Sequence, residues 1–209
     1  YKRQVVLNGF DINCGGFTTA GAVARSIAFG SNNINITNTA TNTIINAAVV
    51  GGFTYTGTGG FKLTGNAGSG TTRTINFGGT SGATEATTPN FTVTAGQAGS
   101  IVTMTTASYV NNLTFVSGFL GTFTPPAATN IYGSLTAVSG MVWTTGTGTI
   151  NFLGTSGTDN ITTAGFTLYN VTFNGAGGTW ALQDDLNANV VTLTAGTLTA
   201  TTQNVTASS

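Results

Sequence analysis

The sequence predicts an all-β protein built as a right-handed parallel β-solenoid, or β-helix, with irregular coils of roughly 17 to 20 residues. Three observations lead to this fold class. Thr, Gly and Asn make up nearly half of the chain, with 45, 31 and 21 of 209 residues. Apolar and polar residues alternate over short segments, and some of these segments recur. The recurrence favours a solenoid over a sandwich or barrel, because a sandwich has no reason to reuse a sequence unit.

The composition favours strands and turns over helices. Thr is β-branched, so it prefers extended backbone, and its hydroxyl solvates an outward face without charge. Gly and Asn suit turns that need a positive φ. The chain has only five basic and five acidic residues and no His. Like residues stack between the coils of a solenoid, where equal charges repel but Asn and Thr form hydrogen-bonded ladders. Scarcity of charge is therefore expected.

Alternating segments mark the expected strands. Residues 34–37, 91–94, 113–115, 171–173 and 191–194 all read apolar then polar, with Thr or Asn at the polar positions. This period of two places the apolar side chains on one face of a strand. We expect the core to include Ile27, Phe29, Ile75, Phe77, Phe115, Ile150, Phe152, Val171, Phe173 and Leu193.

Two sequence echoes suggest the coil length. Residues 74–82 and 149–157 match at eight of nine positions with an offset of 75, and residues 112–115 resemble residues 170–173 at an offset of 58. The two offsets differ by 17, about one coil of short strands. Pro125-Pro126 and the segment 20–25 are expected to be excursions from a coil. We interpret residues 1–209 as one solenoid segment of a longer polypeptide, because the chain starts at Tyr1 and stops just after an apparent strand.

Four stretches carry a resemblance to a known family: residues 7–17 (LNGFDINCGGF), 25–30, 130–136 and 173–183. They resemble Gly/Thr-rich repeat proteins of tailed phages of aquatic cyanobacteria and related aquatic metagenomes, which are described as tail-fibre-like or structural. The resemblance covers most of the chain in imperfect copies. It implies a long fibre exposed to the medium, and it implies no catalytic residue. Bacterial surface filaments and adhesins contain similar solenoids.

The sequence predicts no catalytic, cofactor-binding or metal-binding residue. Zero net charge gives no electrostatic footprint for nucleic acid. Cys14 is the only cysteine, so no internal disulfide forms, and without His it lacks a base to activate it as a nucleophile. We expect Cys14 to be a small core residue. No apolar run approaches the roughly 18 residues of a membrane span.

The acidic residues leave two alternatives open. Asp184 and Asp185 are the only adjacent pair, and a glycosidase needs two carboxyl groups facing each other across a cleft. The glycosidase alternative adds Asp159, Glu85 or Asp11 from another coil, and calcium at Asp159 or Asp184/Asp185 is a further alternative. We favour solvated turns for this pair.

Three other patterns have a structural interpretation beside a functional one. Asn-x-Thr occurs at Asn35, Asn90, Asn112, Asn160, Asn170 and Asn204, either as glycan acceptors or as a product of strand alternation. The Gly-rich stretches 57–60 and 65–70 lack the Lys of a phosphate loop and predict turns. Aromatic residues offer sugar platforms or core packing; they are Trp143, Trp180, Tyr55, Tyr109, Tyr132 and Tyr169.

The expected function is therefore mechanical. We expect a structural segment of an extracellular or virion fibre, a stiff spacer that supports attachment to a host or surface. A bacterial cell-surface filament or adhesin is the first alternative, and a polysaccharide-degrading tailspike is the second. Expected partners are further copies of the chain, head-to-tail or as a trimer, and a host surface glycan.

Overall fold

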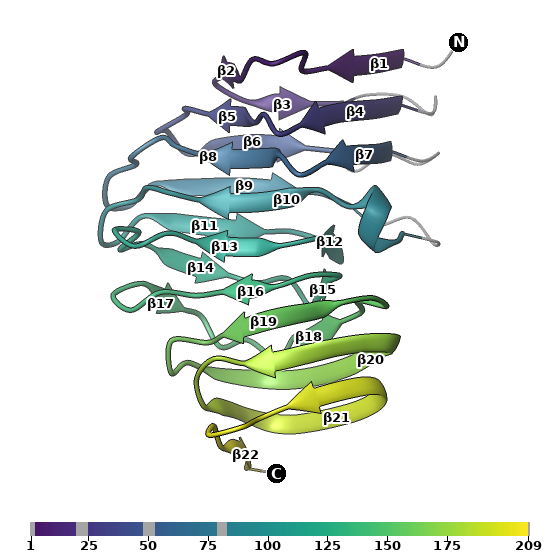
Figure 1. Ribbon diagram of the computed structural model, residues 1–209. Helices are drawn as coiled ribbons and strands as arrows, with labels where there is room; N and C mark the ends of the chain where they lie inside the picture. The colour runs from purple at the N-terminus through teal and green to yellow at the C-terminus, as the bar shows by residue number, and fades with distance from the viewer. Residues whose placement is uncertain (1–2, 20–24, 48–52, 79–82, 209) are drawn as a thin grey trace.

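The protein is an all-β stack of parallel strands. The computed structural model describes residues 3–19, 25–47, 53–78 and 83–208. Figure 1 shows flat tiers piled on one another, with the N-terminus at one end and the C-terminus at the other. Every strand pair in these ranges is parallel. The all-β prediction is confirmed, and the arrangement is consistent with a parallel β-solenoid.

The strands form three ladders. The first contains β1 (Arg3–Val6), β4 (Arg25–Gly30) and β7 (Phe53–Gly57). The second contains β3 (Phe17–Thr18), β6 (Asn42–Asn46), β9 (Thr72–Asn76), β11 (Ile101–Met104), β14 (Thr122–Thr124) and β17 (Val142–Trp143).

The third ladder has two columns. The β2 column contains β2 (Ile12–Cys14), β5 (Ile34–Ile36), β8 (Gly60–Leu63), β10 (Asn90–Val93), β13 (Leu113–Phe115), β16 (Leu135–Thr136) and β19 (Thr158–Thr162). The β12 column contains β12 (Ser108–Val110), β15 (Ala128–Ile131) and β18 (Thr149–Phe152). The long β20 (Thr167–Leu182) pairs with both columns and is followed by β21 (Leu186–Thr199) and β22 (Val205–Ala207).

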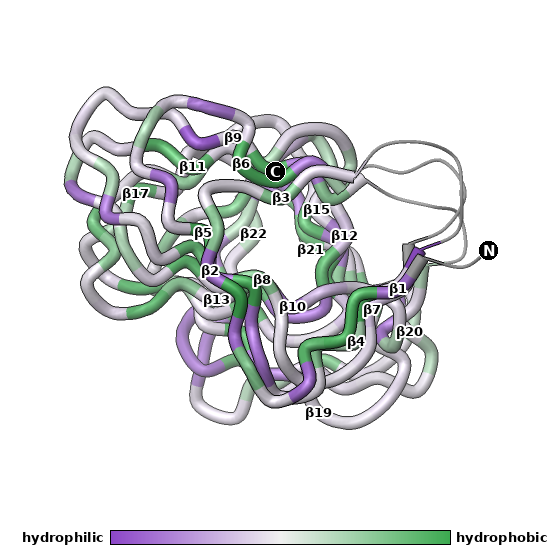
Figure 2. The backbone as a smooth tube through the Cα atoms, turned by 90° about the horizontal axis from the view of Figure 1, so that it is seen from above, coloured by the Kyte–Doolittle hydropathy of each residue, from purple (hydrophilic) through white to green (hydrophobic). Residues whose placement is uncertain are grey.

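In the first three tiers the chain visits the first ladder, the β2 column and the second ladder in turn, so each strand lies against the equivalent strand of the next tier. β1, β2 and β3 are followed by β4, β5 and β6 in the same ladders. Figure 2, a view down the stack, shows the strands of successive tiers overlying one another. The expected coil of 17 to 20 residues is wrong for most tiers. Paired residues are as close in sequence as Thr179 and Thr197, 18 apart, and as distant as Asn42 and Arg73, 31 apart.

The sequence echoes misled the estimate because their copies occupy different sides of the stack. Residues 74–82 begin in β9 of the second ladder, whereas residues 149–157 begin in β18 of the β12 column. Residues 112–115 include β13 of the β2 column, whereas residues 170–173 belong to the part of β20 that pairs with β18. Each side needs the same alternation of apolar and polar residues. The same short segment therefore serves on any side, and its offset does not measure a coil.

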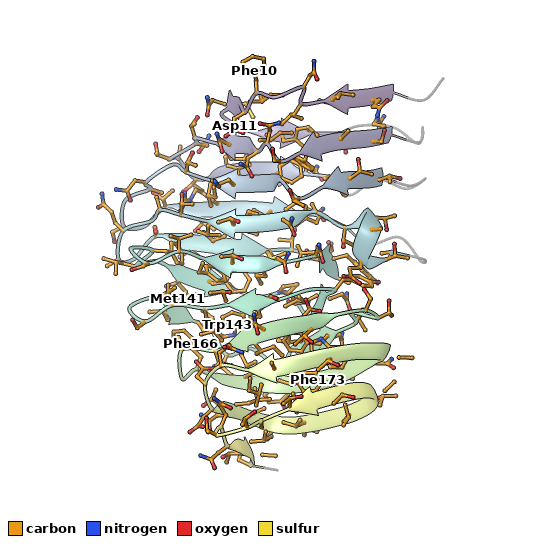
Figure 3. All side chains as sticks on the ribbon, viewed as in Figure 1. Phe10, Asp11, Met141, Trp143, Phe166 and Phe173 are labelled. Carbon is orange, nitrogen blue, oxygen red and sulfur yellow. The ribbon has the colours of Figure 1, made fainter. Side chains whose placement is uncertain are left out.

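Aromatic rings fill the interior along the stack. Phe61 contacts Phe29, Phe17 and Phe77, with ring centroids 5.1 to 5.5 Å apart. Closer to the C-terminus, the ring centroid of Trp143 lies 4.9 Å from that of Phe123 and 6.5 Å from that of Phe166. Figure 3 shows Trp143 and Phe166 close together. Such pairs add stability beyond the burial of their apolar area. The rings join successive tiers into one continuous core.

Nine of the ten expected core residues are buried: Ile27, Phe29, Ile75, Phe77, Phe115, Ile150, Phe152, Val171 and Phe173. The prediction for Leu193 is wrong, because its side chain is 54 % exposed. Leu193 lies in β21, and β22 pairs only with its first residues, Leu186 to Ala188. The alternation around Leu193 is that of a covered strand, but the structure describes no strand that covers this part of β21.

A ladder of polar side chains links the tiers where the chain enters the β2 column. We call Asn90, Asn112, Ser134 and Asn160 the Asx ladder. The backbone N–H and side-chain Nδ2 of Asn112 donate to Oδ1 of Asn90, at 3.2 and 2.8 Å. Ser134 N donates to Asn112 Oδ1 at 2.6 Å, and Asn160 N donates to Ser134 Oγ at 3.0 Å. Asn90, Asn112 and Ser134 thus each satisfy a backbone donor of the following tier, which fixes the register between tiers.

Arg73 is buried inside the stack rather than exposed. It shares the inward face of β9 with Ile75 and is completely inaccessible to solvent. Its guanidinium donates to the carbonyl oxygens of Gly65 and Ala95, which belong to the turns of two successive tiers. Burial lowers the pKa of Arg73 to about 10, so the group stays charged at neutral pH. The Arg73 guanidinium therefore links the turn that contains Gly65 to the turn that contains Ala95.

The main excursion from the tiers differs from the two expected ones. Pro125 and Pro126 lie in the short connection between β14 and β15, and Pro126 is buried. Residues 20–24 of the other expected excursion lie outside the described residues. Between β9 and β10 the chain instead forms the 3-10 segment η1 (Glu85–Thr87), which packs against β7 of the first ladder. This segment creates the cavity described next.

Candidate functional site

A cavity of about 520 Å³ lies between η1, β7 and two later turns. β7 contributes Tyr55, Thr56 and Gly57, and the η1 segment contributes Glu85, Ala86 and Thr88. Asn111, which follows β12, and Ser156, which lies between β18 and β19, complete the lining. The cavity therefore draws on residues that are up to about half the chain apart in sequence.

Hydrogen bonds hold the η1 segment over the later tiers. The Tyr132 hydroxyl donates to the carbonyl oxygen of Ala83 at 2.7 Å. The Ser156 hydroxyl donates to Oε2 of Glu85 at 3.0 Å. At the start of the segment, Thr84 N donates to Oγ1 of Thr87 at 2.9 Å. These contacts give the Glu85 carboxylate a defined position at the cavity.

Asp159 lies close enough to Glu85 for their charges to interact. Burial, followed by repulsion from Glu85, raises the pKa of Asp159 to about 6, while a hydrogen bond from Ser134 acts in the opposite direction. Oδ2 of Asp159 is buried and has no hydrogen-bond partner in the described part of the chain. The Glu85 carboxylate, which comes from a different tier, therefore adds to the cost of a negative charge on Asp159. Only Glu85 lines the cavity itself.

The other acidic residues cap turns instead of joining this pair. Oδ1 and Oδ2 of Asp184 accept hydrogen bonds from the backbone N–H groups of Thr163 and Ala164, at 2.8 and 2.6 Å. Asp185 accepts from Asn204 N at 2.7 Å. The interpretation of the Asp184/Asp185 pair as merely solvated turn residues is therefore incomplete, because both bind the backbone of neighbouring tiers.

Asp11 and Cys14 also take part in the structure of the stack, Asp11 through hydrogen bonds and Cys14 through packing. Asp11 accepts a hydrogen bond from Asn33 N at 2.7 Å, and this bond, together with one from the Asn35 side chain, lowers its pKa. Cys14 is a free thiol that packs partly buried against the core, and burial raises its pKa. In the ranges described, no three His, Cys, Asp or Glu side chains gather as a metal site requires.

Most of the aromatic candidates for a sugar platform belong to the core. Trp180, Trp143, Tyr55 and Tyr132 are buried, and Tyr109 is half-buried. Tyr169 is 36 % exposed on the outward side of β20. Tyr55 differs from the others because, although buried, it also forms part of the cavity wall. Core packing, the interpretation favoured from the sequence, therefore holds for four of the six aromatic candidates.

The Asn-x-Thr motifs coincide largely with hydrogen bonds between tiers. Asn90, Asn112 and Asn160 belong to the Asx ladder. The Asn35 amide donates to Asn13 Oδ1 at 3.0 Å, and Asn204 bonds to Asp185. The Asn-x-Thr pattern therefore arises mostly because a strand places a hydrogen-bonding Asn, an inward apolar residue and an outward Thr at consecutive positions. The Gly-rich stretches 57–60 and 65–70 lie in turns and strand ends beside the preceding or following tier.

Searches against protein-family models, curated proteins and solved structures found no match to this chain. Across residues 3–19, 25–47, 53–78 and 83–208, no helix has the length and apolar character needed to cross a membrane. The site must therefore be interpreted from its own geometry.

Sequence reasoning named Glu85 and Asp159 but did not place them together. It also missed Thr56, Asn111 and Ser156 as cavity residues. A local signal did exist, because Glu85 is the only Glu of the chain. A charge in a sequence that otherwise avoids charge marks a position where the uniform stack is interrupted. Its partners come from other tiers, so the sequence contained no comparable signal for them.

Proposed function

We propose that this chain is a structural segment of an extracellular or virion fibre. In this proposal a right-handed parallel β-solenoid acts as a stiff spacer that supports attachment to a host or surface. The observation that carries the proposal is the continuity of the stack, since the third ladder alone runs from β2 to β22. In the described residues strand pairing joins each tier to its neighbours, so further tiers would lengthen the stack. The right hand follows from the strong preference of connections between parallel strands.

The surface chemistry supports a mechanical role outside the cell or on a particle. Outward positions of the strands carry mainly Thr and Asn, which hydrogen-bond between tiers without charge, as Thr94 Oγ1 does with Leu63 O at 2.9 Å. A bacterial cell-surface filament or adhesin would use the same rod. The two settings differ in what the rod is joined to, and labelling of intact particles and cells with an antibody against this chain would separate them.

Association between copies is part of the proposal, head-to-tail or as a trimer. Large apolar side chains are exposed in the tiers at both ends of the stack, with Phe10 80 % and Val6 58 % exposed at one end and Leu193 at the other. Figure 3 shows Phe10 at the N-terminal end. Strand edges with exposed apolar residues favour association through further strands.

Solution scattering tests the rod directly. Small-angle X-ray scattering of the purified chain should give the profile of an elongated particle, and light scattering should show species larger than one chain at rising concentration. A compact, near-spherical particle would refute the spacer role. A discrete monomer over the whole accessible concentration range would refute association.

The proposed role is non-catalytic. Glycoside hydrolysis uses two carboxyl groups on either side of the bond that breaks, and Glu85 is the only carboxylate on the cavity wall in the described residues. Incubation of the chain with polysaccharides should release no reducing ends above background. Steady release that disappears in Glu85→Gln would establish the tailspike alternative instead.

A further inference from the structure

We propose that the cavity beside η1 is a binding site for a neutral saccharide. This site goes beyond the spacer role, because a rod needs no cavity. It would give the fibre a specific contact on its side, away from either end of the described stack.

The lining offers the groups that recognise a polyhydroxylated ligand. The Glu85 carboxylate accepts hydrogen bonds from ligand hydroxyl groups, and the Asn111 amide both donates and accepts. Ser156 and Thr56 add hydroxyl groups. Tyr55 borders the cavity from β7, while its ring packs in the core against Phe29, with ring centroids 6.2 Å apart, and so keeps this wall rigid. A small number of placed polar groups that converge on a cavity fix the orientation of a small ligand.

The charge at the cavity selects against other classes of ligand. The described wall has one carboxylate, a second one at Asp159 lies nearby, and neither Lys nor Arg lines it. An anionic ligand would be repelled and would find no cation to pair with. A divalent metal ion prefers several carboxylate ligands, and the wall supplies only that of Glu85. A neutral ligand with many hydroxyl groups remains the best match.

The walls are organised before any ligand arrives. Ser156 holds Glu85 from a tier 71 residues away, and Tyr132 holds the backbone at Ala83 from 49 residues away. Binding to a fixed wall avoids the free-energy cost of ordering loops and side chains. The same contacts explain why the site depends on the stack, because its two sides come from different tiers.

Titration with defined oligosaccharides tests the proposal. The probes are neutral hexasaccharides of glucose, galactose and mannose, an anionic oligogalacturonate, and calcium chloride alone, measured by calorimetry and saturation-transfer NMR at about pH 7. At least one neutral probe should bind, and the oligogalacturonate should bind at least about tenfold more weakly. Absence of binding by every neutral probe at millimolar concentration, preference for the anionic probe, or saccharide binding only with calcium would overturn the proposal.

Variants locate the bound saccharide in the cavity. Ala86→Trp places a large side chain in the cavity, and Glu85→Gln removes the charge while keeping an acceptor for Ser156. Each should weaken binding by about tenfold or more, Ala86→Trp because its side chain occupies the ligand's space and Glu85→Gln because a hydrogen bond to a charged acceptor becomes a weaker one to a neutral acceptor. Asp11→Asn is the matched control, because it removes a distant carboxylate and puts Asn where other tiers carry Asn. It should bind as the parent does.

The outcome is separable from the spacer role. If both cavity variants bind as tightly as the parent, the site is refuted while scattering still reports the rod. Far-ultraviolet circular dichroism verifies that each variant is folded. Should Ala86→Trp fail to fold, Glu85→Gln and the smaller change Ala86→Leu carry the same test.

Discussion

The Asx ladder predicts that removing one of its members destabilises the stack locally. Asn112 is the informative position, because it acts as both donor and acceptor. Its Nδ2 donates to Asn90 Oδ1 at 2.8 Å, and its Oδ1 accepts from Ser134 N at 2.6 Å. Asn112→Ala removes both side-chain bonds but leaves the bond from the Asn112 backbone to Asn90 in place.

The expected cost follows from these contacts. Each lost hydrogen bond contributes about 0.5 to 1.5 kcal/mol, and a half-buried N–H left without an acceptor, here Ser134 N, costs about 1 to 3 kcal/mol. The cost of leaving Ser134 N without an acceptor already includes the loss of its hydrogen bond to Asn112, so that bond is not counted a second time. We expect the free energy of unfolding to fall by about 2 to 4 kcal/mol.

Denaturation in urea measures this change, with the fluorescence of the buried Trp143 and Trp180 as the signal. Hydrogen exchange adds a local readout, since the Ser134 amide should lose protection while amides in distant tiers keep theirs. Asn66→Ala is the control, because Asn66 is exposed in a turn. Equal stability of the Asn112 and Asn66 variants, with Ser134 protection unchanged, would refute the role of the ladder.

Three further predictions test other parts of the stack. Asp184→Ala should lower the unfolding free energy by about 2 kcal/mol, because the turn at Thr163 loses its acceptors; an unchanged thermal midpoint would contradict this. Gly59→Ala should prevent folding, since a Cβ there overlaps the Asn32 carbonyl oxygen. A soluble variant with native circular dichroism would show that the backbones at Gly59 and Asn32 leave room for a side chain. Because the raised pKa of Asp159, about 6, means that the folded state holds the proton more tightly, stability should decline as pH rises from about 4 to about 6. Asp159→Asn should abolish that decline in urea titrations, and a decline of the same size in the variant would assign it to another group.

The alternation of residues fixes which side chains face inward, and this much can be read from the sequence. Ile150 and Phe152 are separated by one polar residue, as are Val171 and Phe173, and all four are buried. Such a pattern depends only on neighbours two positions apart in a strand. It failed at Leu193, where the pattern is the same but β22 does not extend over the residue. Coverage by the next tier is a property that a strand's own sequence does not contain.

The sequence by itself determined an all-β chain of short strands, the composition of its core and the near absence of charge, because each of these follows from local preferences and from the repulsion of stacked charges. Only the tertiary structure decided the coil lengths, since these depend on connections of variable length between strands, and only it brought Glu85, Ser156 and Asp159 together from different tiers. Contacts between tiers are set by register, which turn lengths and stacked side chains determine jointly. For that reason the architecture was predictable from short windows of sequence, whereas the cavity was not.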